Sequence, residues 1–281
     1  MKVSIITVTY NSEKYLQDCI QSVKNQTYGN IQHIIVDGKS TDNTLKIIKK
    51  NEGSISRWIS EPDRGMYDAI NKGINLASGD IIGILNSDDI LAGPNVIMDI
   101  VSHFEETGTD AVYGDLLYVD PTNINVVHRY WKGLPFKRNR FRYGWMPAHP
   151  TFYLRRELIQ QFGGYKNHYY TAADYEFMAR YLYRHHVNAA YLPELLVKMR
   201  SGGVSNTNIY ARLRANRRDY LAMKQNRVPF ALLVSILKPL IKIPQFNNKP
   251  PATLLTPKHI TTIPTTSVLI IPKKKEVDSV A

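Results

Sequence analysis

The sequence is poor in the features that mark several classes of protein. It has a single cysteine, Cys19, so no internal disulfide can form, which is typical of a reducing compartment. No run approaches the roughly 20 apolar residues that a membrane-spanning helix requires. The run Val3–Val8 near the amino terminus is too short for a signal peptide. The signatures G-x-G-x-x-G after a first strand and G-x-x-x-x-G-K-[ST] are both absent, which argues against a dinucleotide dehydrogenase and a P-loop enzyme.

Acidic residues are scarce in the last third of the chain. Residues 1–197 hold 21 basic and 21 acidic residues, whereas residues 198–281 hold the remaining 15 basic and 3 acidic ones. The formal net charge of +12 therefore comes entirely from the carboxyl-terminal part. Such a one-sided basic segment indicates an anionic partner surface, either nucleic acid or anionic lipid.

The first 110 residues alternate between short apolar segments and amphipathic ones. Strands are predicted over Val3–Thr9, Ile31–Val36, Ile55–Ser60 and Ile81–Leu85, and helices over residues 15–23, Leu45–Lys50 and Met66–Leu76. A further helix is expected to begin near Pro94. Four strands that alternate with three helices predict an α/β fold with a parallel sheet and right-handed crossovers.

Acidic side chains follow two of these strands at the point where each strand ends. Asp37 follows the second strand, and Asp88 and Asp89 follow the fourth. Ligands of open α/β sheets bind at the carboxyl ends of the strands, so a nucleotide there can bridge these acids. Two adjacent carboxylates repel each other unless a cation or hydrogen-bond donors accompany them, and a hard divalent cation is the usual answer. The alternative is an Asx turn or a helix N-cap at each place.

Four segments together resemble a known family. They are residues 3–11 (V-S-I-I-T-V-T-Y-N), residues 37–42 (D-G-K-S-T-D), residues 61–73 (E-P-D-R-G-M-Y-D-A-I-N-K-G) and residues 86–89 (N-S-D-D). Over roughly residues 1–220 the sequence resembles a family 2 glycosyltransferase with the GT-A fold. The resemblance implies a mostly parallel central sheet flanked by helices. It also implies an inverting transfer of a sugar from a nucleotide-diphosphate donor, a UDP-sugar, to a hydroxyl of a glycan or lipid-linked acceptor in surface polysaccharide or glycolipid biosynthesis.

The resemblance implies roles for individual residues. The donor would be bound by Thr9, Tyr10, Asp37, Asp63, Asp68, Asp88 and His149. Tyr10 and Asp37 would hold the base, Asp88 the ribose, and Asp89 a divalent metal, Mn²⁺ or Mg²⁺, on the diphosphate. Asp37 accepting the imide N–H of uracil would select that base over cytosine. Many members have an acid where this chain has Asn86, so the ligands around the metal differ from the common pattern.

Three of these residues have a structural alternative. Asp63 can cap the helix that begins at Met66. Asp68 can form an ion pair with Lys72 on a solvated helix face. His149 can be a structural histidine in a turn.

The second half of the chain has a different pattern of residues and predicted elements. Short antiparallel strands are predicted over Ala111–Gly114, Leu116–Val119 and Val126–Tyr130. Another strand is predicted to begin at Phe152, and a last one is predicted over Leu192–Met199. A long basic helix is predicted over Thr207–Gln225. Residues 131–146 are rich in basic and aromatic side chains without a clear period and are predicted to form a mobile loop. Such a loop suits sugar rings and phosphates, or single-stranded nucleic acid, or it packs on the core.

A candidate catalytic base opens a helix predicted over residues 171–184. The resemblance implies that an acidic residue at the start of this helix is the general base, and Asp174 is the matching position. Many members have a second acid where this chain has Ala173. A carboxylate at a helix amino terminus interacts favourably with the helix dipole and is placed to take a hydroxyl proton. The alternative is a simple N-cap.

The sequence thus predicts a GT-A domain over residues 1–225, with a nucleotide-binding half (1–110) and an acceptor half (111–225). A basic amphipathic membrane-association segment (226–246) and a disordered tail (247–281) would follow. The protein is expected to be cytoplasmic, peripheral at the anionic inner face of the plasma membrane, and without a nucleic-acid partner; the sequence leaves the oligomeric state open. A docked helix over residues 226–246 is the alternative. Two other classes stay open, a sugar-phosphate nucleotidyltransferase and a non-catalytic module that binds RNA or anionic lipid.

Overall fold

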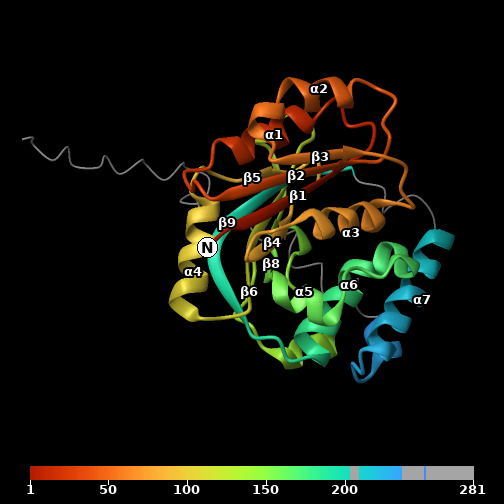
Figure 1. The fold of residues 1–281 in the computed structure, drawn as a ribbon. Coiled ribbons are helices and arrows are strands. Elements are labelled where there is room, and N and C mark those ends of the chain that lie inside the picture. Colours follow the sequence, from red (N-terminus) through yellow and green to blue (C-terminus); the bar gives the residue numbers. More distant parts are fainter. Residues whose placement is uncertain (203–208, 236–249, 251–281) are drawn as a thin grey trace, which may run out of the picture.

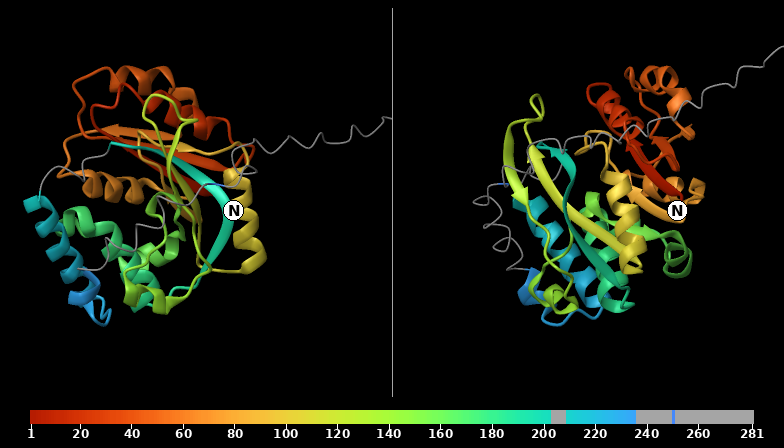
Figure 2. Two further views of the ribbon diagram at one scale, coloured as in Figure 1. Left: turned by 180° about the vertical axis from the view of Figure 1, so that it is seen from behind. Right: turned by 90° about the vertical axis from the view of Figure 1, so that its left-hand side faces the viewer.

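One mixed sheet runs through the molecule (Figure 1). The computed structural model describes residues 1–202, 209–235 and 250, except for the side chains of residues 209–214. In this part of the chain, nine strands join in the order β3-β2-β1-β4-β8-β6-β9-β5, and β7 pairs with β6. Helices lie against both faces of the sheet, as Figures 1 and 2 show.

The first four strands confirm the predicted parallel half. They are β1 (Val3–Thr9), β2 (Ile31–Asp37), β3 (Arg57–Ser60) and β4 (Ile81–Ile84), and all their pairings with one another are parallel. The helices between them are α1 (Leu16–Lys24), α2 (Thr44–Lys50), with the 3₁₀ turn η1 (Glu52–Ser54) after it, and α3 (Met66–Leu76).

Alternating side chains of the central strands reach two separate cores. In β2, Ile34 and Val36 pack with α3, whereas Ile35 packs with α1 and α2. Helices α1 and α2 therefore cover one face of the sheet and α3 the other (Figure 1). Helix α4 (Val96–Thr107) packs with α1 on its face. Because both faces are covered, the central strands β1 and β4 are buried along their whole length.

Strands from the second half complete the same sheet with mostly antiparallel pairings. They are β5 (Ile90–Leu91), β6 (Ala111–Val119), β7 (Val127–Trp131), β8 (Tyr153–Arg155) and β9 (Ala189–Arg200). β8 runs antiparallel to β4 and β6, and β9 runs parallel to β6. The two predicted halves of the chain thus share one sheet.

The prediction of separate strands before and after Asp115 was wrong, because β6 is a single strand with a register irregularity at this point. Asp115 is buried, and its carboxylate accepts hydrogen bonds from the hydroxyls of Tyr130 and Tyr191 and from the Gly133 amide. These partners come from β7, β9 and the following loop. They compensate for burying this carboxylate within a continuous strand.

The segments around Asp174 are helical. Short elements η2 (Arg138–Tyr143), η3 (His149–Thr151) and α5 (Arg156–Phe162) precede η4 (Asn167–Ala172), which leads into α6 (Ala173–Met178) and the π-helix η5 (Ala179–Arg184). The loop predicted over residues 131–146 contains η2, and Phe141 within it is fully buried against Trp145, Tyr175 and Tyr183. This segment therefore packs on the core.

Folded contacts continue past the predicted boundary at residue 225. Helix α7 (Ile209–Gln225) packs against η4 and α6. Asn226, Val228 and Val234 are buried, and the Asn226 amide donates to Glu176 Oε1 (3.4 Å). The rest of the predicted membrane segment and the predicted disordered tail, residues 236–249 and 251–281, lie outside the described residues. Within the described part, no helix is long and apolar enough to cross a membrane.

Candidate active site

The loops that follow β1, β2 and β4 are hydrogen bonded to one another at one edge of the sheet. The Asn11 amide donates to Ser40 Oγ and the Ser12 amide to Thr44 Oγ1, both at 2.8 Å. The hydroxyls of Ser12 and Ser87 are also 2.8 Å apart. The strand-end acids predicted from sequence therefore share one edge, as the parallel pairing requires.

Tyr10, Gly38 and Asp63 come together beside the end of β1. Tyr10 is 63% exposed, and its ring lies near Gly38 and Asp63. A Cβ atom added to Gly38 would be 2.5 Å from Asp63 Oδ2 and 3.4 Å from Tyr10 Cδ2. Asp63 Oδ1 accepts a hydrogen bond from the Gly65 amide (2.8 Å). Thr9 is buried, and its hydroxyl has no partner among the described residues. The lack of a side chain at Gly38 thus lets the Asp63 carboxylate lie close to the backbone beside the exposed Tyr10 ring.

Asp37 lies at this edge but is itself fully buried. Its Oδ2 accepts hydrogen bonds from the Ser40 amide (3.0 Å) and the Ser60 hydroxyl (2.6 Å), and its Oδ1 accepts one from the Ser40 hydroxyl. In this arrangement the carboxylate fixes the turn after β2. The hypothesis that Asp37 accepts a base N–H stays a prediction.

The Asp88–Asp89 turn carries two carboxylates in a poorly hydrated place. Burial raises the pKa of Asp89 well above its usual range, and the charge of Asp88 raises it further. Burial also raises the pKa of Asp88, while the nearby Arg200 guanidinium lowers it. Both acids are therefore costly to hold as anions unless a cation joins them.

Two oxygen atoms at this turn fit a divalent cation. Asp89 Oδ1 and Asn86 Oδ1 are buried and have no hydrogen-bond partner within the described residues, while the Asn86 amide donates to Asp89 Oδ2 (3.1 Å). The described part of the chain holds no group of three or more His, Cys, Asp or Glu residues arranged to bind a metal. One or two carboxylates suffice for Mg²⁺ when substrate phosphates and water complete the shell.

Asp174 is half-buried at the start of α6, among aromatic rings. The Tyr175 amide donates to its Oδ1 (2.7 Å). The Tyr165 ring stacks on Tyr67, with centroids 5.5 Å apart, and its hydroxyl is hydrogen bonded to His149 Nε2 (2.7 Å). Burial, and then the charge of Asp174, raises the pKa of Tyr67 and Tyr165 well above their usual range. Burial lowers the pKa of His149 by more than the charge of Asp174 raises it, which favours the neutral imidazole.

Tyr118 of β6 lies close enough to both groups of acids for their charges to affect its phenol. Burial raises the pKa of its phenol, the Arg129 guanidinium lowers it, and the charges of Asp89 and Asp174 both raise it. Arg129 stacks over the Tyr118 ring at 4.6 Å and over the Trp131 ring at 5.4 Å. Asp89 and Asp174, which are far apart in sequence, therefore act on one phenol.

Asp68 joins α3 to the segment before Asp174. Its Oδ1 accepts hydrogen bonds from the Arg64 guanidinium and the Asn167 amide, both at 3.0 Å. These bonds lower the pKa of Asp68. The pair with Lys72 that was the structural alternative is not formed, and Lys72 instead pairs with Glu61 at 2.8 Å. The described contacts of Asp68 are structural, and donor binding by this residue stays a prediction.

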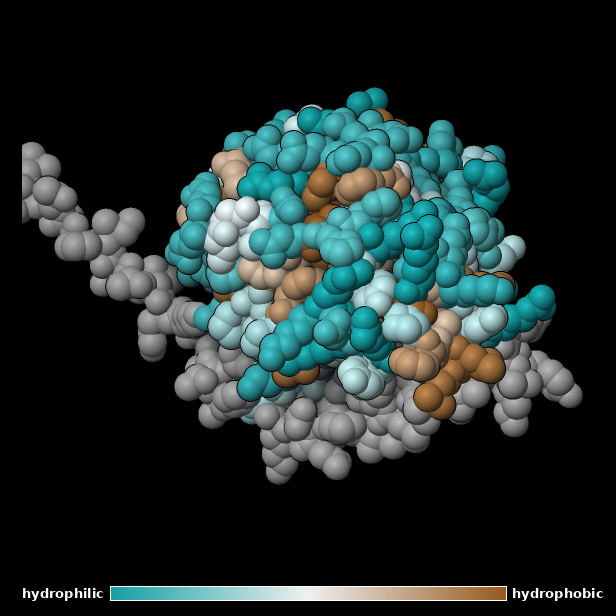
Figure 3. Space-filling model, turned by 90° about the horizontal axis from the view of Figure 1, so that it is seen from below, coloured by the Kyte–Doolittle hydropathy of each residue, from teal (hydrophilic) through white to brown (hydrophobic). Residues whose placement is uncertain are grey.

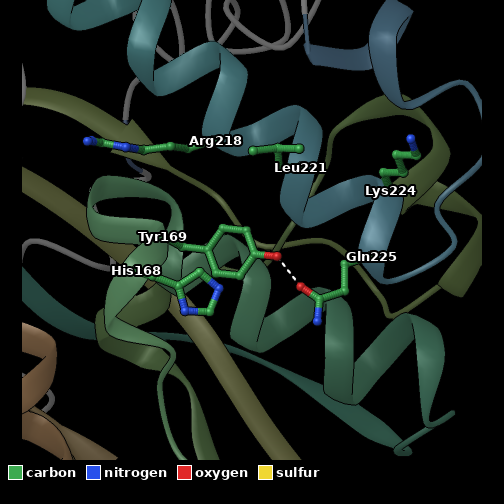
Figure 4. A pocket seen from close by; sticks show the side chains of 6 residues that line it. All are labelled: His168, Tyr169, Arg218, Leu221, Lys224 and Gln225. Atoms are coloured by element: carbon green, nitrogen blue, oxygen red, sulfur yellow. Dashed lines mark hydrogen bonds between the residues drawn. The ribbon is translucent and has the colours of Figure 1, made fainter.

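A separate depression lies between η4 and α7, as Figure 4 shows. It is lined by His168, Tyr169, Arg218, Leu221, Lys224 and Gln225. The Tyr169 hydroxyl donates to Gln225 Oε1 across it. None of the strand-end acids lines this depression, so it is distinct from the site described above.

Sequence reasoning missed Tyr118, Arg129 and Arg200. Arg200, at the end of β9, donates from Nη1 to the Asp88 carbonyl (2.8 Å) and from Nη2 to Asp18 Oδ2 (2.6 Å). Each reaches the site through strand pairings between distant segments, and the sequence carries no local signal for such pairings. The motif-based residues, in contrast, follow directly after predicted strands.

Comparison with known proteins identifies the class of protein that has this fold and site. The chain is similar to the PGL/p-HBAD biosynthesis glycosyltransferase of Mycobacterium bovis, with 32% identity over 215 residues, which cover 73% of this chain and 79% of the relative. The fold is that of the GT-A glycosyltransferases. The protein is therefore a glycosyltransferase.

Two solved structures illustrate this fold. S. aureus TarS 1-349 in complex with UDP has a TM-score of 0.59 and 20% identity, and covers 84% of this chain and 66% of that chain. The mannosyltransferase PcManGT from Pyrobaculum calidifontis, in complex with GDP-Man and Mn²⁺, has a TM-score of 0.59 and 16% identity over 90% of this chain and 78% of that chain.

The model of the glycosyl transferase family 2 matches residues 4–163, more than half of the chain. The chain belongs to this family. Membership confirms the resemblance seen in its motifs and sets aside the nucleotidyltransferase and the non-catalytic module as alternatives.

Proposed function

We propose that the protein transfers a sugar with inversion from a UDP-sugar to a hydroxyl of a glycan or lipid-linked acceptor. The observation that carries the proposal is the pair of oxygens, Asp89 Oδ1 and Asn86 Oδ1, that lie buried without a partner among the described residues in the turn after β4, with Asp174 half-buried at the start of α6. A donor diphosphate beside the first acid would place its anomeric carbon toward the second. The UDP complex of TarS, whose chain shares this fold, supports the choice of a nucleotide-diphosphate donor.

The donor nucleotide would bind along the carboxyl ends of β1, β2 and β4. The exposed Tyr10 ring suits a flat base, and Asp63 and Asp37 lie on either side of Gly38 close to this ring. Asp88 is half-buried in the turn after β4, and it would hold the ribose. His149, neutral and hydrogen bonded to Tyr165, offers a polar edge to the diphosphate or the acceptor.

Asp89 and Asn86 would hold a divalent cation, Mn²⁺ or Mg²⁺, through their unpartnered oxygens. Such a cation, when bound, stabilises the negative charge that develops on the departing diphosphate without any proton transfer. The Mn²⁺ complex of PcManGT supports this choice of cofactor. Asn86 contributes no charge, so Asp88 and the diphosphate would supply the remaining negative charge at the cation.

Asp174 would act as the general base. The acceptor oxygen attacks the anomeric carbon from the face opposite the diphosphate. As the bond to the diphosphate breaks, the acceptor proton passes to the Asp174 carboxylate. The stacked Tyr67 and Tyr165 rings lie near this carboxylate, whose charge affects both phenols. Attack from the opposite face gives inversion at the anomeric carbon.

A membrane surface is the proposed location of the acceptor, at the cytoplasmic face. Phe230, Leu232 and Leu233 are 71%, 63% and 55% exposed, beside the cations Lys224 and Arg227. Figure 3 shows hydrophobic residues gathered beside hydrophilic ones on this face. Exposed apolar side chains with adjacent cations suit the headgroup region of an anionic leaflet. The M. bovis relative is a PGL/p-HBAD biosynthesis glycosyltransferase, which supports a biosynthetic role for the transfer.

The test of the proposal is Asp174→Asn. This variant should bind UDP with Mn²⁺ as the wild type does, but transfer should fall by a factor on the order of 10² or more. UDP release from a panel of UDP-sugars with candidate acceptors measures transfer, and calorimetry measures UDP binding. Glu157→Gln, which changes an exposed acid in the first turn of α5, is the matched control. Unchanged transfer in Asp174→Asn would make this residue a cap only.

A further inference from the structure

The carboxyl-terminal residue of β9, Arg200, lies beneath the Asp88–Asp89 turn. It is 5% exposed, and its pairing partner on β6 is Val119. Its guanidinium makes three contacts at once. Nη1 donates to the Asp88 carbonyl (2.8 Å), Nη2 donates to Asp18 Oδ2 (2.6 Å), and the plane lies 4.7 Å from the centroid of the Tyr15 ring.

These contacts join three elements that are distant in sequence. Asp18 and Tyr15 belong to the start of α1, and Asp88 to the turn after β4. The bond to Asp88 is made to its backbone carbonyl, so it fixes the path of the turn and leaves the Asp88 carboxylate available. A planar guanidinium can hold a carbonyl, a carboxylate and an aromatic face together, which an ammonium cannot.

The turn needs such an anchor because its own bonds are few. The Asp89 amide donates to the Asn86 carbonyl (3.0 Å), and the Asn86 side chain donates to Asp89 Oδ2 (3.1 Å). Asp89 Oδ1 is left without a partner. The half-buried Asp88 and the buried Asp89 repel each other and push the turn away from a geometry in which both carboxylates face one cation.

We infer that Arg200 is a positioning residue, which holds the Asp88–Asp89 turn in the geometry that binds the cation of the donor diphosphate. This inference rests on the proposed function of Asp89. It goes further because it makes the metal site depend on β9 and α1, two elements that carry no metal ligand. Residues that orient metal ligands typically change metal affinity by 10–100-fold when they are replaced.

A merely structural arginine would behave differently. Its loss would lower the stability of the fold and would weaken uridine and UDP binding to a similar degree. A positioning arginine acts on the diphosphate–metal end, so its loss weakens Mn²⁺-dependent UDP binding and leaves uridine binding unchanged. The contrast between uridine and UDP therefore separates the two roles.

The experiment compares Arg200→Lys and Arg200→Gln with the wild type. Calorimetry gives the affinities for uridine and for UDP with Mn²⁺, and electron paramagnetic resonance gives Mn²⁺ binding in the presence of UDP. Both variants should lose about 10-fold or more in Mn²⁺–UDP affinity, with uridine affinity unchanged. Asp18→Asn, which keeps the bond to the Asp88 carbonyl, should lose less.

Arg155→Lys is the matched control. Arg155 also ends a strand, donates to a backbone carbonyl (Thr109, 3.2 Å) and stacks on a ring (Phe104, 5.7 Å), but it lies away from the turn. It should bind Mn²⁺ and UDP as the wild type does. Arg200→Lys keeps the charge and supplies the test if Arg200→Gln fails to fold. Wild-type affinity for Mn²⁺–UDP in Arg200→Lys would overturn the inference about Arg200 but would leave the proposed metal site standing. A wild type that binds UDP equally well without Mn²⁺ would overturn both this inference and the proposed metal site.

Discussion

Asp89→Asn should stabilise the unliganded protein while it removes metal-dependent donor binding. Asp89 is fully buried, its Oδ1 has no partner in the described part of the chain, and Asp88 repels it. A neutral amide of the same shape removes the repulsion and the cost of a buried charge. We expect a gain of about 1 kcal/mol, which for a chain of this size raises Tm by roughly 2–4 °C.

Thermal unfolding with and without UDP and Mn²⁺ measures both effects. The wild type should gain Tm when UDP and Mn²⁺ are added together, whereas Asp89→Asn should start higher and gain nothing from Mn²⁺. Asp115→Asn is the control, because the equally buried Asp115 accepts bonds from Tyr130, Gly133 and Tyr191. That variant should lose stability. A lower Tm in Asp89→Asn, or a retained Mn²⁺ response, would refute the reasoning.

Three further predictions follow from single contacts. Gly38→Ala should weaken UDP binding about tenfold, roughly 1.4 kcal/mol, because the added methyl group would press on Asp63 and Tyr10. Gly53→Ala is the control, because nothing lies within 4 Å of a Cβ atom added there, and it should bind UDP as the wild type does. Calorimetry measures both affinities. Burial lowers the pKa of His33 from 6.5 to about 4. The stability that depends on a neutral imidazole at this position is therefore fully present above pH 6.5 and is lost as the pH falls toward 4. Urea unfolding should show the wild type losing roughly 3 kcal/mol more than His33→Gln over this range; an equal loss would contradict the assignment. Phe230→Ser with Leu232→Ser should reduce binding to anionic vesicles, whereas Met98→Ser, a 40% exposed residue on α4, should leave vesicle binding intact.

The first half of the fold could be predicted because its signals are local. Strand β1 and helix α3 have the predicted bounds, since β-branched alternation and a 3.6-residue period are properties of short windows. The edge position of Asp37, Asp88 and Asp89 follows from parallel pairing alone. These residues needed no knowledge of the second half.

The second half could not be predicted to the same degree, because its features depend on distant partners. Asp115 lies within the single strand β6, where tyrosines of β7 and β9 supply hydrogen bonds to its buried carboxylate. Arg200 reaches the Asp88 carbonyl only because β9 pairs with β6 and β5. The burial of Asp37 likewise depends on Ser60, from the neighbouring β3.

A crystal structure with UDP and Mn²⁺ tests the central claim most directly. An anomalous Mn²⁺ peak should lie about 2.0–2.2 Å from an Asp89 carboxylate oxygen and from diphosphate oxygens, with the uracil ring against Tyr10 and Asp174 facing the open side of the diphosphate. An Mn²⁺ peak with no Asp89 ligand, or UDP bound between η4 and α7, would contradict the account.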